Sequence, residues 1–269
     1  MLFNSFHFLI FFPLLVGLYY LIPHRWRPLL LLTASSYFYM AFVPKYILVL
    51  LFLITVDYFL AKSIEIRTGR ERKFFLLVSI LTNIGTLFFF KYLNFFNTNV
   101  AVLADFLNWN YSTTILSVAL PLGLSFHVFQ SLSYVIEVYR GKYQAEKNFL
   151  TYALYVMFFP QLVAGPIERP YHLLPQFKLE HEFDAQNVRR GLERMLWGFF
   201  KKLVIADQIA VIVNYLYGNI PTDGPTLILL IILFAYQLYC DFSGYSDIAI
   251  GSNFLVIYLR KLLIFYQKY

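Results

Sequence analysis

The chain has 269 residues, of which 59% are hydrophobic and 14% are charged, whereas a soluble domain carries about 25% charged residues. So few charges cannot cover a water-facing surface, which excludes a soluble globular domain and predicts an integral membrane protein. The net charge of +7 does not indicate nucleic-acid binding, because the basic residues stand in short loops between apolar runs rather than on polar faces.

The first half of the chain is dominated by apolar runs. A helix needs about 20 apolar residues to cross a bilayer, with about 17 at the short end. Five runs come near or reach that length, at residues 6–22, 28–43, 46–61, 74–90 and 115–136. They predict an all-α protein that crosses the membrane several times.

The loops between these runs differ in charge on alternate sides of the membrane. The loops on one side hold ten basic residues: Arg25, Arg27, Lys62, Arg67, Arg70, Arg72, Lys73, Arg140, Lys142 and Lys147. The loops on the other side hold only Lys45 and Lys91. Because basic loops stay in the cytoplasm, we expect the N-terminus outside and residues 137–147 inside.

The next apolar run breaks this pattern. Residues 149–159 are too few to span, and Pro160 and Gly165 follow at once. The polar segment after them is basic and therefore also predicted to be cytoplasmic. A re-entrant segment at residues 149–166 accounts for both facts. Such a broken helix survives at membrane depth only where protein or a cavity shields its backbone.

The remainder of the chain alternates apolar and charged stretches. Residues 191–202 carry Arg194, Lys201 and Lys202 among apolar side chains, which favours a helix lying at the membrane interface. Residues 203–217 then dip inward with Asp207. Residues 226–240 form a further span, and residues 248–265 form the last apolar stretch.

Polar groups inside apolar runs are costly and ask for a reason. The densest group runs from Asp241 to Asp247, with Ser243, Tyr245 and a glycine that permits a bend or a close approach. It suits the lining of a site or an interfacial turn with a capping Asp or Ser, and both interpretations stay open. Cys240 beside it is expected to be a small core residue.

A second polar group lies along one helix. His127, Gln130 and Tyr134 are spaced three and four residues apart, so they share one helical face. This face lines a cavity or, as the favoured interpretation, forms interhelical hydrogen bonds. His127 is not favoured as a base, because no carboxylate that would orient it is evident. Asp57, inside the third run, is expected to pair with another helix. No metal-binding spacing occurs.

Five blocks of sequence resemble the membrane-bound O-acyltransferase family, and its bacterial alginate O-acetyltransferase branch most. They are LPLGLSFHVFQSLSY at residues 120–134 with VYRG at 138–141, FFPQLVAGPI at 158–167, WGFFKK at 197–202, IAD at 205–207, and YCDFSGYSD at 239–247. The resemblance covers nearly all of residues 1–251. We therefore predict a family-like region at 1–251 and a divergent tail at 252–269.

The resemblance implies a ring of tilted helices around a thin centre. A cytoplasmic acyl donor of the acyl-CoA or acyl-carrier type meets its acceptor there, and no cofactor stays bound. The acceptor would be an extracellular polysaccharide or wall polymer, with periplasmic partners, at the inner membrane. Seven residues are expected to line one cytoplasm-side cavity: Gln130, Tyr134, Gln161, Asp241, Ser243, Tyr245 and Asp247.

The family's catalytic histidine is not carried over. In the family it follows the stretch that matches residues 239–251, together with an Arg-Trp-His and a Trp-His-Gly motif. Residues 252–269 contain neither motif. The resemblance therefore implies a chain that ends before its catalytic residue and is inactive by itself. A transporter or channel, or a non-catalytic scaffold of the same export pathway, is the alternative.

Overall fold

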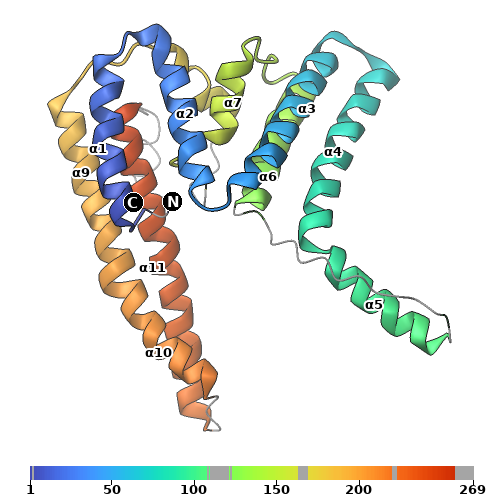
Figure 1. Ribbon diagram of the computed structural model, residues 1–269, viewed down its shortest axis with the longest axis vertical. Helices are drawn as coiled ribbons and strands as arrows, with labels where there is room; N and C mark the ends of the chain where they lie inside the picture. The colour runs from blue at the N-terminus through green and yellow to red at the C-terminus, as the bar shows by residue number, and fades with distance from the viewer. Residues whose placement is uncertain are drawn as a thin grey trace.

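The computed structural model describes residues 1, 3–107, 109, 121, 123–162, 169–219 and 223–257. These residues form helices and turns without strands, which confirms the all-α prediction (Figure 1). The α-helices are α1 (Phe6–Leu21), α2 (Arg27–Met40), α3 (Ile47–Ile66), α4 (Gly69–Lys91), α5 (Leu93–Phe106), α6 (Leu124–Tyr139), α7 (Phe149–Met157), α8 (Pro170–Leu173), α9 (Ala185–Phe199), α10 (Asp207–Gly218) and α11 (Gly224–Val256). The 3-10 helices are η1 (His24–Trp26), η2 (Pro44–Tyr46) and η3 (Gln176–Lys178), and η4 (Phe200–Ala206) is a π-helix.

Within the described residues, three helices are long and apolar enough to cross a membrane: Pro44–Ile66, Gly69–Lys91 and Gly224–Val256. They confirm a membrane protein. The first four predicted runs correspond to α1 to α4, and the described part of the fifth corresponds to α6. The sequence reading missed α5, which projects sideways from the foot of α4 (Figure 1). The number of crossings and the membrane concerned stay predictions.

Local sequence sets where several helices begin. The side chains of Ser5, Asn148, Asp184 and Asp223 each accept a hydrogen bond from a backbone N–H of the following turn, which satisfies a donor that the helix leaves unpaired. Gly123 starts α6 with φ 73°. A Cβ there would lie 2.5 Å from the Leu162 carbonyl oxygen, so the left-handed turn and the tight contact both require glycine.

The loops that the charge pattern assigned to one side meet at one end of the bundle. Arg27 donates to the carbonyl of His181 at 2.6 Å. Arg72 donates to the carbonyl of Tyr139 at 2.6 Å, and the Tyr58 hydroxyl donates to the carbonyl of Lys147. These contacts join α2 to the segment before α9, α4 to the end of α6, and α3 to the segment before α7. We keep as a prediction that this end faces the cytoplasm.

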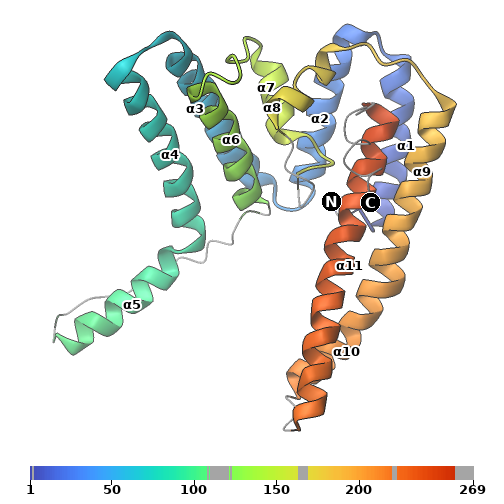
Figure 2. The same ribbon diagram turned by 180° about the vertical axis from the view of Figure 1, so that it is seen from behind.

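The short helix α7 is enclosed by protein. Every residue from 151 to 157 is buried, and α7 packs against α2, α3 and α6. Lys178 in η3 forms an ion pair of 2.7 Å with Glu146, which precedes α7. The chain therefore returns to the end from which it entered (Figure 2), as a re-entrant segment should. Residues 163–166 of the predicted segment lie outside the described residues.

The expectation that residues 191–202 form a helix lying along the membrane interface is corrected by the structure. Helices α9, η4 and α10 form one long arm that runs antiparallel to α11 (Figures 1 and 2). Gly191 faces Gly251 and Gly198 faces Gly244, and a Cβ at any of the four would clash with the opposite helix. Glycines seven residues apart on both helices let the backbones approach closely, and the charges find partners on α11.

The turn considered at residues 241–247 is also wrong. Helix α11 continues without a break from Gly224 to Val256. Gly244 therefore serves close approach to α9 rather than a bend. The same helix passes residue 251, so the described structure has no break at the boundary proposed there. The predicted division into residues 1–251 and 252–269 stays a prediction, and residues 258–269 lie outside the description.

Candidate functional site

One face of α6 carries a row of buried polar side chains that contact α7. The Nδ1 of His127 lies 3.2 Å from the Val156 carbonyl oxygen. Because a carbonyl only accepts hydrogen bonds, Nδ1 carries the proton, and Nε2 of the neutral ring is an acceptor. Tyr134 accepts from the backbone N–H of Glu146 at 2.8 Å. The favoured interpretation, interhelical hydrogen bonding, is confirmed for this face.

Three polar atoms at the contact of this face with α7 and the residues after it have no hydrogen-bond partner among the described residues. Gln130 donates through Nε2 to the Tyr155 carbonyl at 2.8 Å and to Oε1 of Gln161 at 3.2 Å. This leaves Oε1 of Gln130, Nε2 of Gln161 and Nε2 of His127 buried and unpaired. Each residue is at most 1% exposed. An unpaired buried polar group costs about 1–3 kcal/mol, so these three atoms together require an explanation. We call them the α6–α7 polar group.

Asp57 lies beside this group and joins three helices, α3, α4 and α6. Its carboxylate accepts from Ser79 at 2.6 Å, from Asn83 at 3.0 and 2.8 Å, and from Ser131 at 2.5 Å. Ser131 also lies 3.0 Å from the Tyr152 hydroxyl. The donors come from α4 and α6, so Asp57 pairs with other helices as expected. Its oxygens are all engaged, which favours a structural role.

A second polar group joins the α9 arm to α11. Asp247 pairs with Arg194 at 3.0 Å and with Lys201 at 2.6 Å. Lys202 pairs with Asp241 at 2.5 Å and with Asp207 at 3.0 Å. The Lys201 ammonium also donates to Ser243 at 2.9 Å. Three cations thus meet three carboxylates, which removes most of the cost of holding charge beside apolar helices.

The π-helix η4 explains how two successive lysines both reach α11. Its wider turn changes the direction of the side chains between α9 and α10, and such bulges are frequent at functional sites. Sequence reasoning placed Lys201 and Lys202 at the interface and missed their role as partners of Asp241 and Asp247. The seven-residue spacing of Gly191 and Gly198, and of Gly244 and Gly251, was the available signal.

The seven predicted lining residues fall into two separate groups. Gln130, Tyr134 and Gln161 belong to the α6–α7 side, whereas Asp241, Ser243, Tyr245 and Asp247 lie on α11. Helix α2 stands between the two groups (Figures 1 and 2). Tyr245 packs on the ring of Phe3 at 4.6 Å. A common cavity for the two groups stays a prediction. Among the described residues no three His, Cys, Asp or Glu side chains gather as a metal site.

Comparison with known proteins gives strong sequence matches. The chain is 38% identical to the probable alginate O-acetylase AlgI of Azotobacter vinelandii, over all of this chain and 54% of that protein. It is 36% identical to AlgI of Pseudomonas putida, over all of this chain and 56% of that protein. It is 31% identical to the peptidoglycan O-acetyltransferase of Helicobacter pylori, over 86% of this chain and 47% of that protein. No family model matches the chain.

The chain spans about half the length of the curated relatives it matches. The alginate O-acetylase matches include residues 252–269, because they cover the whole chain. The candidate membrane helices and these relatives support the resemblance that the motifs at residues 120–134, 158–167 and 239–247 indicated. The chain is similar along its whole length to alginate O-acetylases, which belong to the membrane-bound O-acyltransferase family.

Proposed function

We propose that the chain forms part of a membrane O-acyltransferase that passes an acetyl group from a cytoplasmic donor to a hydroxyl of an exported polysaccharide or wall polymer. The observation that carries this proposal is the 38% identity to an alginate O-acetylase along the entire chain. The likeness to a peptidoglycan O-acetyltransferase supports acetyl as the group and leaves the polymer open. A donor of the acyl-CoA or acyl-carrier type, periplasmic partners and an inner-membrane location belong to the same proposal.

We assign the α6–α7 polar group to binding rather than to proton transfer. In acyl transfer the acceptor oxygen attacks the donor carbonyl, the bond to the donor sulfur breaks, and the hydroxyl proton passes to a base. The family resemblance assigns that base to a histidine beyond residue 251. Among the described residues, Gln161 Nε2 is a donor without a partner, and Gln130 Oε1 and His127 Nε2 are acceptors without one. Together they suit a carbonyl oxygen and a hydroxyl held in one orientation.

The ion-pair group on α11 has a different assignment. Asp241 and Asp247 are engaged by Lys202, Lys201 and Arg194, so neither carboxylate is free to act as a base. We propose that these pairs hold the α9 arm against α11. A lining role for Asp241, Ser243, Tyr245 and Asp247 requires a further part of the protein to face them.

A chimera tests the proposed function. Residues 1–269 replace the matching part of the Azotobacter alginate O-acetylase, and the chimera is expressed in a strain that lacks its own alginate O-acetylase. We expect acetyl esters to return to the secreted alginate. A second chimera that exchanges only residues 124–162 preserves the remaining packing. Alginate without acetyl esters, while both chimeras are folded in the membrane, would contradict the proposal.

A further inference from the structure

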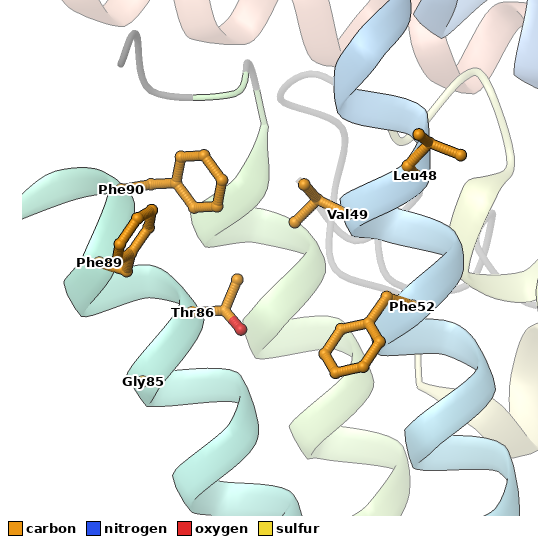
Figure 3. A pocket seen from close by; sticks show the side chains of 7 residues that line it. All are labelled: Leu48, Val49, Phe52, Gly85, Thr86, Phe89 and Phe90. Carbon is orange, nitrogen blue, oxygen red and sulfur yellow. The ribbon is translucent and has the colours of Figure 1, made fainter. Parts of the chain in front are cut away.

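A groove opens between α3 and α4 at the end of the bundle opposite the basic loops. Its cavity of about 470 Å³ has the size of a ligand site. Leu48, Val49 and Phe52 line it from α3, and Gly85, Phe89 and Phe90 line it from α4 (Figure 3). Both helices are candidate membrane spans, and only 11% of the apolar stretch of α4 is buried inside the protein. The groove therefore opens toward the hydrocarbon of the bilayer.

The lining selects an apolar occupant. Thr86 supplies the only side-chain hydroxyl in the lining, and that hydroxyl already donates to the Thr82 carbonyl at 2.8 Å. A Cβ added at Gly85 would meet nothing within 4 Å, so space remains on the groove's inner wall. Aliphatic and aromatic surface without a free polar partner favours a hydrocarbon chain over a peptide or sugar.

The end of the groove is positively charged. Lys45 lies in η2 just before α3, and Lys91 is the last residue of α4. The rings of their neighbours Tyr46 and Phe90 lie 5.9 Å apart, so both lysines stand at the same end of the groove. Neither lysine takes part in the ion pairs formed by the described residues. Lysines at the ends of membrane helices extend toward the headgroups.

We propose that this groove binds an anionic phospholipid of the bilayer. One acyl chain lies between α3 and α4 along Phe52 and Gly85, and the phosphate lies between Lys45 and Lys91. The apolar lining and the paired lysines at one end complement a hydrocarbon chain that ends in negative charge. In the loops up to Lys147, the charge pattern assigns only Lys45 and Lys91, among the basic residues, to this side of the membrane.

The test is native mass spectrometry of the purified 269-residue chain in detergent. Phosphatidylglycerol and phosphatidylcholine with identical acyl chains are titrated separately, so the two lipids differ only in headgroup. One variant, Lys45→Gln with Lys91→Gln, removes the charge. Its matched control, Arg140→Gln with Lys142→Gln, removes two charges at the opposite end. Gly85→Leu fills the groove, and Gly17→Leu on α1 is its control because that position is equally open.

We expect one tightly bound phosphatidylglycerol and weaker phosphatidylcholine. Each lysine near a headgroup contributes about fivefold in affinity, so the double lysine variant should lose about 25-fold for phosphatidylglycerol. Gly85→Leu should lose the bound lipid, while both controls retain it. Retention by Gly85→Leu or by the double lysine variant would overturn the proposal. So would displacement of the lipid by glycerol phosphate alone, or a protein dimer that forms in place of the lipid complex.

Discussion

A single methyl group added between the antiparallel helices α9 and α11 should destabilise the protein. Gly198 faces Gly244 across the pair. A Cβ built on Gly198 would lie 2.6 Å from the Gly244 carbonyl oxygen and 2.9 Å from the Ile248 backbone nitrogen. Both are backbone atoms, which cannot rotate aside as a side chain does. Gly198→Ala therefore forces the two helices apart.

The size of the effect follows from these distances. Ordinary contact for a Cβ begins at 3.4 Å, so α9 must shift by about 0.8 Å to relieve the contact at 2.6 Å. Overpacking of this kind destabilises a protein by about 1–3 kcal/mol. Replacing glycine by alanine inside a helix stabilises the helix by up to about 1 kcal/mol. The shift also loosens the contacts of Lys201 with Asp247 and Ser243. We expect a net loss of about 1–2 kcal/mol.

The assay is unfolding of the chain in mixed micelles by increasing sodium dodecyl sulfate, followed by circular dichroism. Gly17→Ala is the matched control, because Gly17 lies inside α1 with nothing within 4 Å of an added Cβ. The control should be unchanged or slightly more stable. If Gly198→Ala unfolds at the same detergent fraction as Gly17→Ala, the close approach of α9 and α11 is wrong.

Four further predictions follow from individual residues. Asp57→Ala removes the carboxylate that accepts hydrogen bonds from three buried side chains, Ser79, Asn83 and Ser131, and should lower the free energy of unfolding by about 3 kcal/mol, measured by the same detergent titration. Burial lowers the pKa of His181 in spite of its hydrogen bond to a backbone carbonyl, so protonation opposes folding. The free energy of unfolding should be highest above about pH 6.5 and should decline as the pH falls toward the lowered pKa. His181→Gln should flatten that decline in a pH series. Lys142→Cys, in a chain without Cys240, should resist an impermeant thiol reagent applied to intact cells. Ready labelling would show that the predicted orientation is wrong. Residues 1–269 alone should show no transfer from labelled acetyl donor, whereas turnover abolished by His127→Ala would identify a base within this chain.

Much of the fold is legible in the sequence because the bilayer imposes simple rules. Apolar length located α1 to α4, and the charge of the loops indicated which ends lie together, as the bond from Arg27 to the His181 carbonyl shows. A short run followed by Pro160 predicted the re-entrant segment. Hydrophobicity did not reveal α5, because its Asn and Thr residues interrupt the apolar run.

The candidate site was less predictable, because it depends on which helices become neighbours. The spacing of His127, Gln130 and Tyr134 identified a shared face, but no sequence pattern indicated that Gln161 would meet Gln130. The polar residues near Gly244 left a site lining and a turn both open, since a glycine among Asp and Ser is also typical of a turn. Gly244 instead forms a close contact between helices, because the glycines of α9 lie opposite it.

The rate of labelled acetyl transfer from acetyl-coenzyme A to alginate by the chimera, with and without Gln161→Leu, tests most directly whether the α6–α7 polar group serves the reaction. The substitution removes the Nε2 donor, while Gln130 keeps its bond to the Tyr155 carbonyl. The exposed Gln186→Leu on α9 is the matched control. Loss of an orienting contact should slow transfer by about 10²-fold with the amount of folded protein unchanged. An unaltered rate for Gln161→Leu would contradict a role for this group in acyl transfer.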